Sequence, residues 1–147
     1  MNVIERVRDI LQHFPKISQL VDEVHVDLTD HTPTSYGLSS IGDKKLSEDV
    51  VGTEERQHTF LFYAVYSGIN DYERITNSGI LLELALWLER QAGSQIEQSI
   101  GDECYAGEIT EITTANGMLS SVPGENITDG IVYQLQIMAK YTLREDN

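Results

Sequence analysis

The hydrophobic pattern is strongest between residues 57 and 93. Residues 57–66 form an almost continuously apolar run rich in β-forming side chains, which is typical of a central strand covered on both faces. Ser67 and Gly68 interrupt this run. Asn70 then precedes Glu73 by three residues, the spacing of a helix capping box. The pattern therefore predicts a central strand, a tight break and a helix.

The helix is expected to continue to Gly93. Apolar residues cover most of its circumference and leave one polar strip for solvent, which includes Glu83 and Arg90. The apolar positions are Ile75, Leu81, Leu82, Leu84, Ala85, Leu86 and Leu88. We expect this helix to be mostly buried against the strand and to form the core with it.

The N-terminal segment predicts an amphipathic helix. Apolar residues recur at helical spacing on one face, with Asn2 as the expected cap and Pro15 as the stop. These residues are Val3, Ile4, Val7, Ile10, Leu11 and Phe14.

The C-terminal segment gives the clearest strand pattern. Apolar side chains alternate with polar ones across residues 131–143. At about 3.4 Å per residue the strand is roughly 40 Å long, well above the usual length. We expect it either to bend or to be covered in part by another subunit.

The intervening segments are less regular. Residues 24–28 alternate as in a half-exposed strand. Residues 35–52 predict a projecting hairpin or flexible arm, with strands at 35–41 and 44–51 and a turn at Gly42 and Asp43. Residues 105–114 are strand-like, and residues 116–130 predict a long loop that contains Pro123.

These elements predict one domain that spans residues 1–147. The expected fold class is α+β: a mixed, mostly antiparallel sheet of about six strands, with two main helices packed on one face.

Charge limits the possible partners. The formal net charge is −14, and no Lys or Arg occurs between Arg90 and Lys140. Since DNA affinity comes largely from neutralised phosphates, the chain is poorly suited to binding nucleic acid. The simplest interpretation is that such a charge keeps the protein soluble. The more specific alternative is that it forms an acidic surface past which DNA slides.

Candidate chemistry is sparse. The best metal-like cluster is His25, Asp27, Asp30 and His31, whose nitrogen and oxygen ligands suit zinc or manganese. Such short-range pairs also occur by chance, and no second cluster complements this one. Cys104 is the only cysteine, so no intrachain disulfide forms, and we expect a buried, reduced thiol.

No motif for enzymatic chemistry is present. The chain has no phosphate-binding glycine loop, no Gly-x-Ser-x-Gly elbow and no His-Glu-x-x-His motif. It also has no stretch near the roughly 20 apolar residues that span a bilayer, and no signal-peptide core at its start. We expect a non-enzymatic protein without a cofactor or a membrane partner.

The order of elements resembles the minor capsid or tail-completion (tail terminator) proteins of long-tailed phages that infect Gram-positive bacteria. The resemblance lies in the opening helix at residues 2–14, the strand at 58–66 that leads into a helix at 71–91, and the long final strand at 131–144. It covers most of the chain and includes no short diagnostic motif.

The resemblance implies a subunit of a closed ring, expected to be a hexamer, which caps the tail tube and joins it to the head. The implied partners are copies of the same chain, the tail-tube protein and the head-completion proteins. The implied location is the virion, and the host cytoplasm during assembly. In such rings the sheet and a projecting hairpin form the contacts, and an acidic lumen lets DNA pass.

Six residues are the candidate subunit-interface positions: Gly42, Asp43, Lys44, Lys45, Tyr133 and Tyr141. The first four stand at the expected arm tip, and both tyrosines lie on the long final strand, which a neighbour could cover. The alternative function is a small acidic enzyme or a metal- or ligand-binding protein that uses the cluster at His25. An acidic DNA mimic is a weaker third option.

The charge distribution yields the first prediction. We expect the purified protein to bind duplex DNA no better than a neutral control protein, because the stretch between Arg90 and Lys140 offers no cation to phosphate. Fluorescence anisotropy at physiological salt measures this. A nanomolar complex that weakens steeply as salt rises would overturn the prediction.

Overall fold

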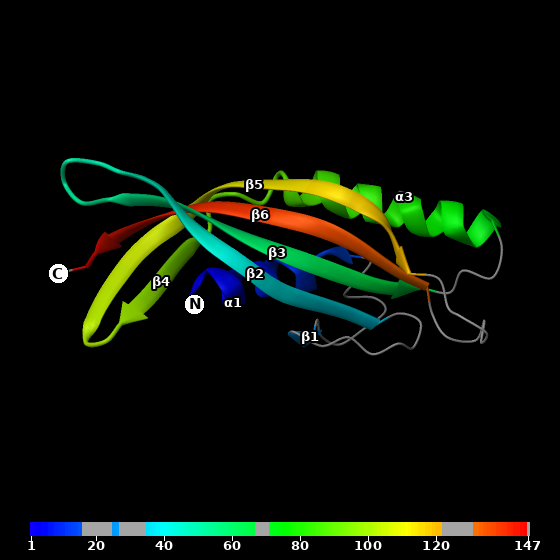
Figure 1. Cartoon of the computed structure of the whole chain (residues 1–147), viewed down its shortest axis with the longest axis horizontal. Helices are drawn as coiled ribbons and strands as arrows, with labels where there is room; N and C mark the ends of the chain where they lie inside the picture. The colour runs from blue at the N-terminus through cyan, green and yellow to red at the C-terminus, as the bar shows by residue number, and fades with distance from the viewer. Residues whose placement is uncertain (16–24, 27–34, 67–70, 122–130, 147) are drawn as a thin grey trace.

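The computed structural model describes residues 1–15, 25–26, 35–66, 71–121 and 131–146 (Figure 1). Its elements are α1 (Val3–Gln12), β1 (His25–Val26), β2 (Ser35–Glu48), β3 (Glu54–Tyr66), α3 (Asp71–Leu88), β4 (Gln95–Ile100), β5 (Glu103–Ser121) and β6 (Ile131–Glu145). The α+β class expected from the sequence is confirmed.

The strands form one elongated, curled sheet in the order β1-β2-β3-β6-β5-β4 (Figure 1). The pairs from β2 to β4 in this order are all antiparallel, and β1 adds two residues in parallel to β2. The expected count of about six strands is therefore close. The segment expected to be a strand at residues 24–28 is described only as the two residues of β1.

Helix α1 forms as its sequence predicts. The side chain of Asn2 accepts a hydrogen bond from the Glu5 N–H at 2.9 Å, and the Asn2 N–H donates to the Glu5 side chain at 3.2 Å. These two bonds make a capping box, which satisfies amide groups that the first helical turn leaves open. Val7 and Leu11 are fully buried on the apolar face.

Helix α3 is buried along one side only, rather than mostly buried. Leu81, Leu84 and Leu88 are buried, while Leu82 and Leu86 are 61% and 47% exposed. Positions three and four apart share a helix face, so the buried set and the exposed set lie on different sides. The expectation that this helix is mostly buried is wrong. Its expected cap, Asn70, lies outside the described residues.

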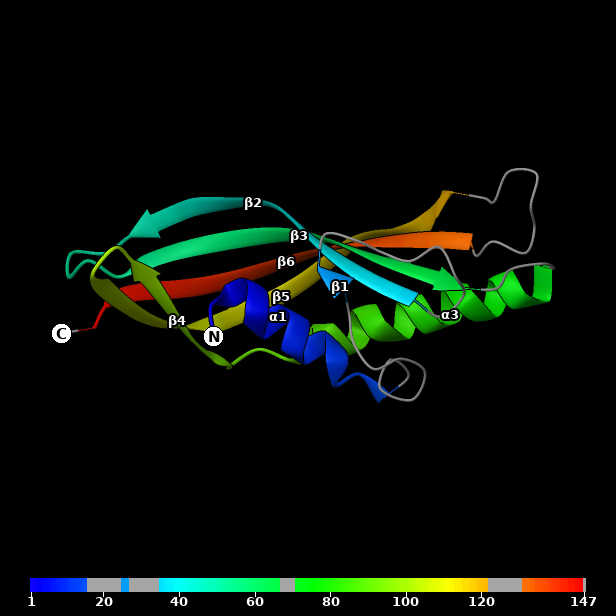
Figure 2. The same ribbon diagram turned by 90° about the horizontal axis from the view of Figure 1, so that it is seen from below.

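The hydrophobic core takes buried residues from the sheet and from both helices. Phe60, Phe62 and Ala64 of β3 are fully buried at alternate positions. The core also takes buried residues from α1, α3 and the neighbouring strands. Helix α1 contacts β4 and β6, whereas α3 contacts β5 (Figure 2). Phe14, just after α1, contacts Trp87 of α3, with 5.2 Å between the centroids of the two rings.

Strand β6 is long, but its neighbours in the same chain cover it. It lies between β3 and β5 and pairs with both in antiparallel register. The adjacent strands β2, β3 and β5 are similarly long. The backbone of β6 therefore has its partners in the same chain, so the length of this strand does not by itself require cover by another subunit.

The turn expected at Gly42 and Asp43 is also misplaced. Residues 35–48 form the single strand β2, and the chain reverses at residues 49–53 before β3. The Asp49 N–H donates to the Thr53 carbonyl at 3.0 Å, and Gly52 has a φ of 90°, which favours glycine. Gly42 instead follows a bulge within the strand.

Three further differences concern the region after α3. Strand β4 was not expected from the sequence, because it contains few apolar residues. Of its two isoleucines, Ile96 is buried and Ile100 is exposed. Residues 116–121, expected to begin a long loop, belong to β5, and residues 122–130 lie outside the described part. Cys104 is exposed rather than buried, because it stands beside the turn between β4 and β5.

Neither described helix has the length and apolar character needed to cross a membrane.

The two sides of α3 supply a matched pair of substitutions. Leu84→Ala should lower the free energy of unfolding by about 2–5 kcal/mol, because it leaves a cavity in the core. Leu86→Ala should lower it by less than about 1 kcal/mol, since that side chain is already half exposed. Urea unfolding measures both. Equal losses would contradict the placement of the helix.

Candidate functional site

The six candidate interface residues do not form one exposed patch. Gly42, Asp43, Lys44 and Lys45 lie within β2 rather than at its turn. Tyr133 and Tyr141 are 2% and 5% exposed, so neither ring is presented at the surface of the single chain. Asp43 and Tyr141 are instead brought together, and the Tyr141 hydroxyl donates a hydrogen bond to Asp43 Oδ2.

The expected metal cluster is not defined. His25 belongs to β1, while Asp27, Asp30 and His31 lie outside the described residues. Within the described part of the chain, no group of three or more His, Cys, Asp or Glu side chains is arranged to hold a metal ion.

The densest polar cluster is centred on Asp43, at the end of the core. Its Oδ2 also accepts from Nδ1 of His58 at 2.8 Å, and its Oδ1 accepts from Nε of Arg56 at 2.7 Å. Nε2 of His58 faces the hydroxyl of Ser40 at 2.5 Å. We call Ser40, Asp43, Arg56, His58 and Tyr141 the Asp43 cluster.

A β-bulge assembles this cluster. In a regular strand Ser40 and Asp43 would point to opposite faces of the sheet. The register shifts by one residue between Ser40 and Gly42, so that Ile41 has no partner on β3. The shift brings Ser40 and Asp43 to the same face, with Ser40 opposite Phe60 and Asp43 opposite His58.

Tyr141 and Arg56 reach the cluster through the neighbouring strand pair. Arg56 of β3 lies opposite Tyr141 of β6. Arg56 also contacts Glu54, with 3.0 Å between Nη1 and Oε1. Three strands therefore supply the five side chains, and Asp43 connects them.

The surroundings keep Asp43 ionised. Burial by itself raises the pKa of its carboxyl, but the hydrogen bonds from Tyr141, His58 and Arg56 outweigh burial and hold the pKa below its ordinary value. Burial and then the bond to Asp43 raise the pKa of the Tyr141 phenol, which stays protonated as a donor. The bond to Asp43 likewise raises the pKa of Arg56.

Sequence reasoning singled out Asp43 and Tyr141 but missed Ser40, Arg56 and His58. Ser40 lies 16 positions before Arg56 and 18 before His58, and no short motif connects it to them. The one possible signal was Gly42 inside a strand-like run, because an isolated glycine there often marks a bulge. Without the β2–β3 register, that signal does not identify His58 as the partner.

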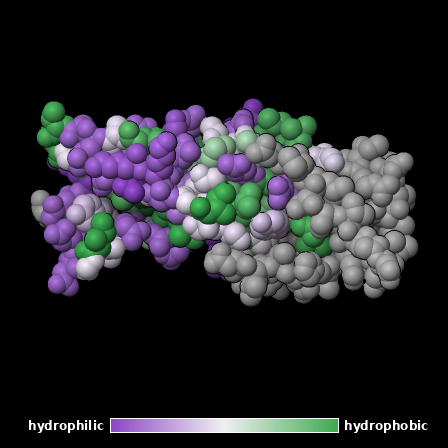
Figure 3. Space-filling view, in the orientation of Figure 1, coloured by the Kyte–Doolittle hydropathy of each residue, from purple (hydrophilic) through white to green (hydrophobic). Residues whose placement is uncertain are grey.

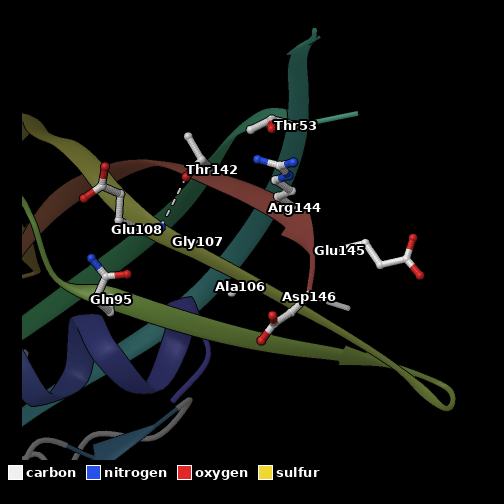
Figure 4. Close-up of a pocket in the computed structure, with 9 residues that line it drawn as sticks. All are labelled: Thr53, Gln95, Ala106, Gly107, Glu108, Thr142, Arg144, Glu145 and Asp146. Atoms are coloured by element: carbon white, nitrogen blue, oxygen red, sulfur yellow. Dashed lines mark hydrogen bonds between the residues drawn. The ribbon is translucent and has the colours of Figure 1, made fainter. Parts of the chain in front are cut away.

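A hollow of about 680 Å³ lies near the C-terminal end of the chain, lined mainly by residues of β5 and β6 (Figure 4). Arg144, Glu108, Glu145 and Asp146 supply its charges. The three carboxylates point in different directions, and Glu145 points away from the other two (Figure 4). They do not converge on one position, so the hollow has no evident ligand centre.

Gly107 forms the floor of this hollow because β5 and β6 approach closely there. A Cβ atom at this position would lie 1.6 Å from the Thr142 carbonyl oxygen, well inside van der Waals contact. The next amide, that of Glu108, donates to Oγ1 of Thr142 at 3.2 Å. Gly107 therefore has a packing role that explains its residue type.

Comparison with known proteins adds no assignment: no protein-family model matches the chain, and no curated protein matches it with significant similarity.

The Asp43 cluster predicts an acid-dependent contribution to stability. Because the folded-state pKa of Asp43 lies below its unfolded value, its stabilisation is present at neutral pH and is lost as pH falls through the folded pKa. Asp43→Asn should lower the free energy of unfolding by about 1–3 kcal/mol at pH 7. The difference from the parent protein should shrink below about pH 4.

Urea unfolding at pH 7, 5 and 3 tests this, with Asp102→Asn in the exposed β4–β5 turn as the control. A difference between parent and Asp43→Asn that stays constant down to pH 3 would contradict the ionised, hydrogen-bonded state of Asp43.

Proposed function

We propose that the protein is a structural subunit of a phage or prophage virion. It serves as a tail terminator or minor capsid protein and forms a ring at the head–tail junction. The observation that carries this proposal is the β2–β3 hairpin, which projects past the core as an arm (Figure 1). Its tip carries the exposed apolar residues Val50 and Val51.

Burial within the chain does not hold this arm. Every residue from 41 to 52 is exposed. The arm is ordered by its ladder with β3, which continues to the pair Glu48 and Glu54, and by the pairing of β3 with β6. A structure of this kind is suited to contact with another molecule, because beyond Asp43 its own domain leaves most of its side chains in solvent.

The tip presents apolar side chains in a fixed turn. The side chain of Val50 is fully exposed, and Val51 is 65% exposed. Oδ1 of Asp49 accepts from the amides of Val51 and Thr53 at 3.0 and 2.9 Å, which fixes the turn. Figure 3 shows hydrophobic atoms at this end of a largely hydrophilic arm. A preorganised apolar tip loses little entropy when it docks.

Docking of this tip on a different surface of a second copy is a heterologous contact. Such contacts close into rings when the rotation between neighbours permits. The ring is proposed as a hexamer that contacts tail-tube and head-completion proteins in the virion, after assembly in the host cytoplasm. Lys44 and Lys45 of the arm supply cations toward an acidic neighbour, although Lys45 already lies within 3.4 Å of Glu48 and 3.6 Å of Glu54.

Two further features are consistent with this role. We propose that both helices cover the sheet face that carries Phe60, so that the opposite face is left for neighbours or for the lumen. The net charge of −14 lets DNA pass without binding, and it also opposes association of free subunits. The ring is therefore expected to close on a tail end rather than in dilute solution.

The arm tip is the place to test this proposal. Val50→Asp combined with Val51→Asp should block termination and joining, since it places charge where an apolar contact forms. Val50→Ile combined with Val51→Ile keeps an apolar tip of similar shape and is the matched control. Each variant is expressed in an induced prophage or phage that lacks its own copy of the gene, and tails and joined particles are counted by electron microscopy.

We expect unjoined tails of irregular length with the aspartate variant and normal particles with the isoleucine control. Normal joined particles from the aspartate variant would overturn the arm-mediated ring. The alternative, a metal- or ligand-binding protein that uses His25, Asp27, Asp30 and His31, is tested separately by metal analysis of purified protein. Stoichiometric zinc or manganese that a His25→Ala variant loses would favour that alternative.

A further inference from the structure

The hydrogen bonds within the Asp43 cluster fix the proton positions on His58. The Asp43 carboxylate is ionised, so it accepts hydrogen bonds and donates none. Nδ1 of His58, 2.8 Å from Oδ2 of Asp43, must therefore carry a proton and donate it. In the neutral imidazole the lone pair is then on Nε2, which lies 2.5 Å from Oγ of Ser40. In that form the Ser40 hydroxyl donates to His58.

This order of contacts is that of a nucleophile, a base and an orienting carboxylate. A serine hydroxyl hydrogen-bonded to Nε2, with Nδ1 held by a carboxylate, defines such a site by geometry rather than by sequence order. Here the chain order is Ser40, Asp43, His58, and the three residues come from only two adjacent strands.

The two outer members of the cluster hold the carboxylate in place. Arg56 binds Oδ1 of Asp43, and Tyr141 binds Oδ2 beside His58. His58 is 7% exposed, and its ring packs on Phe60 with 4.6 Å between the ring centroids. The imidazole therefore cannot turn freely, which keeps Nε2 directed at Ser40.

Ser40, like Asp43, is an exposed residue, whereas His58 and Tyr141 are buried. A hydroxyl that only satisfied a buried histidine would not need access to solvent. Ser40 also directly precedes the bulge, where Ile41 has no partner on β3. In serine nucleophile sites the amide after the nucleophile commonly donates to the oxyanion, and the Ile41 amide occupies that place in sequence.

We propose that Ser40 is the nucleophile of an acyl-transfer site, with His58 as general base and Asp43 as the residue that positions His58. The substrate class is an exposed or activated acyl ester. This activity goes beyond the structural role proposed above and does not depend on it.

The reaction balances without any other co-reactant. Oγ of Ser40 attacks the acyl carbon while His58 Nε2 takes its proton, and the protonated imidazole passes that proton to the departing alkoxide. The products of this half are an acyl-serine and a free alcohol. Water, deprotonated by His58, then attacks the acyl carbon and releases the acid, and the proton returns to Oγ of Ser40.

A fluorophosphonate probe tests the nucleophile directly on the full-length protein. The Ser40 oxygen should form a bond to phosphorus as the phosphorus–fluorine bond breaks and fluoride leaves. Peptide mass spectrometry locates the adduct. We expect labelling at Ser40, none at this position in Ser40→Ala, and unchanged labelling of Ser40 in the control Ser47→Ala, which alters another exposed serine of the arm.

The dependence on His58 separates an activated serine from a merely accessible one. His58→Gln should slow labelling by about a hundredfold, the typical contribution of a general base. Absence of an adduct at Ser40 in the parent protein would overturn the proposal, and this result needs no variant to fold. Labelling that His58→Gln leaves unchanged, in a variant with a parent-like circular dichroism spectrum, would overturn it as well.

The positioning role of Asp43 has its own spectroscopic readout. The Nδ1 proton of His58 should give a downfield proton resonance that Ser40→Ala retains and Asp43→Asn loses, because an amide in place of the carboxylate can donate to the ring and reverse its tautomer. Slow labelling of Asp43→Asn together with loss of this signal supports the role. Retention of both the signal and the parent labelling rate would overturn it.

Discussion

The structure depends on the antiparallel pairing of β3 with β6. Every residue of β3 from Glu54 to Tyr66 has a partner on β6, without a bulge. This uninterrupted ladder places Phe60 opposite Ile137 and Phe62 opposite Leu135, so that one face of the pair is continuously apolar. Residues of both helices belong to the same core cluster as this apolar face. The register shifts lie in the outer pairs, β2 with β3 and β5 with β6.

The irregularities are where the two candidate functions arise. The β2–β3 ladder shifts register between Ser40 and Gly42, and again between Lys45 and Ser47. The first shift creates the Asp43 cluster at the point where the apolar core ends. Beyond it, the hairpin continues as an arm with no buried side chain of its own between residues 41 and 52. One bulge thus separates a packed half of the sheet from an exposed half.

Asp43 links these two halves. It lies on the arm side of the bulge and binds Arg56 and His58 of β3 and Tyr141 of β6. The carboxylate at this position accepts hydrogen bonds from all three side chains. These contacts join the start of the arm to β3 and β6, and the contact with His58 also orients its ring toward Ser40. The proposed arm and the proposed acyl-transfer site therefore both include Asp43.

Sequence alone determined the elements whose side chains repeat with a clear period. The 3.6-residue spacing from Val3 to Phe14, the apolar run in β3 and the alternation in β6 each report burial on a known face, because local geometry sets that period. It could not show that Leu82 and Leu86 of α3 are exposed, since composition does not reveal which side of a helix has neighbours. Only the tertiary structure decided the register of β2 against β3, and with it the meeting of Ser40, Asp43 and His58. A single bulged residue reverses the face of every side chain after it, and that choice is made by pairing between strands rather than by local preference.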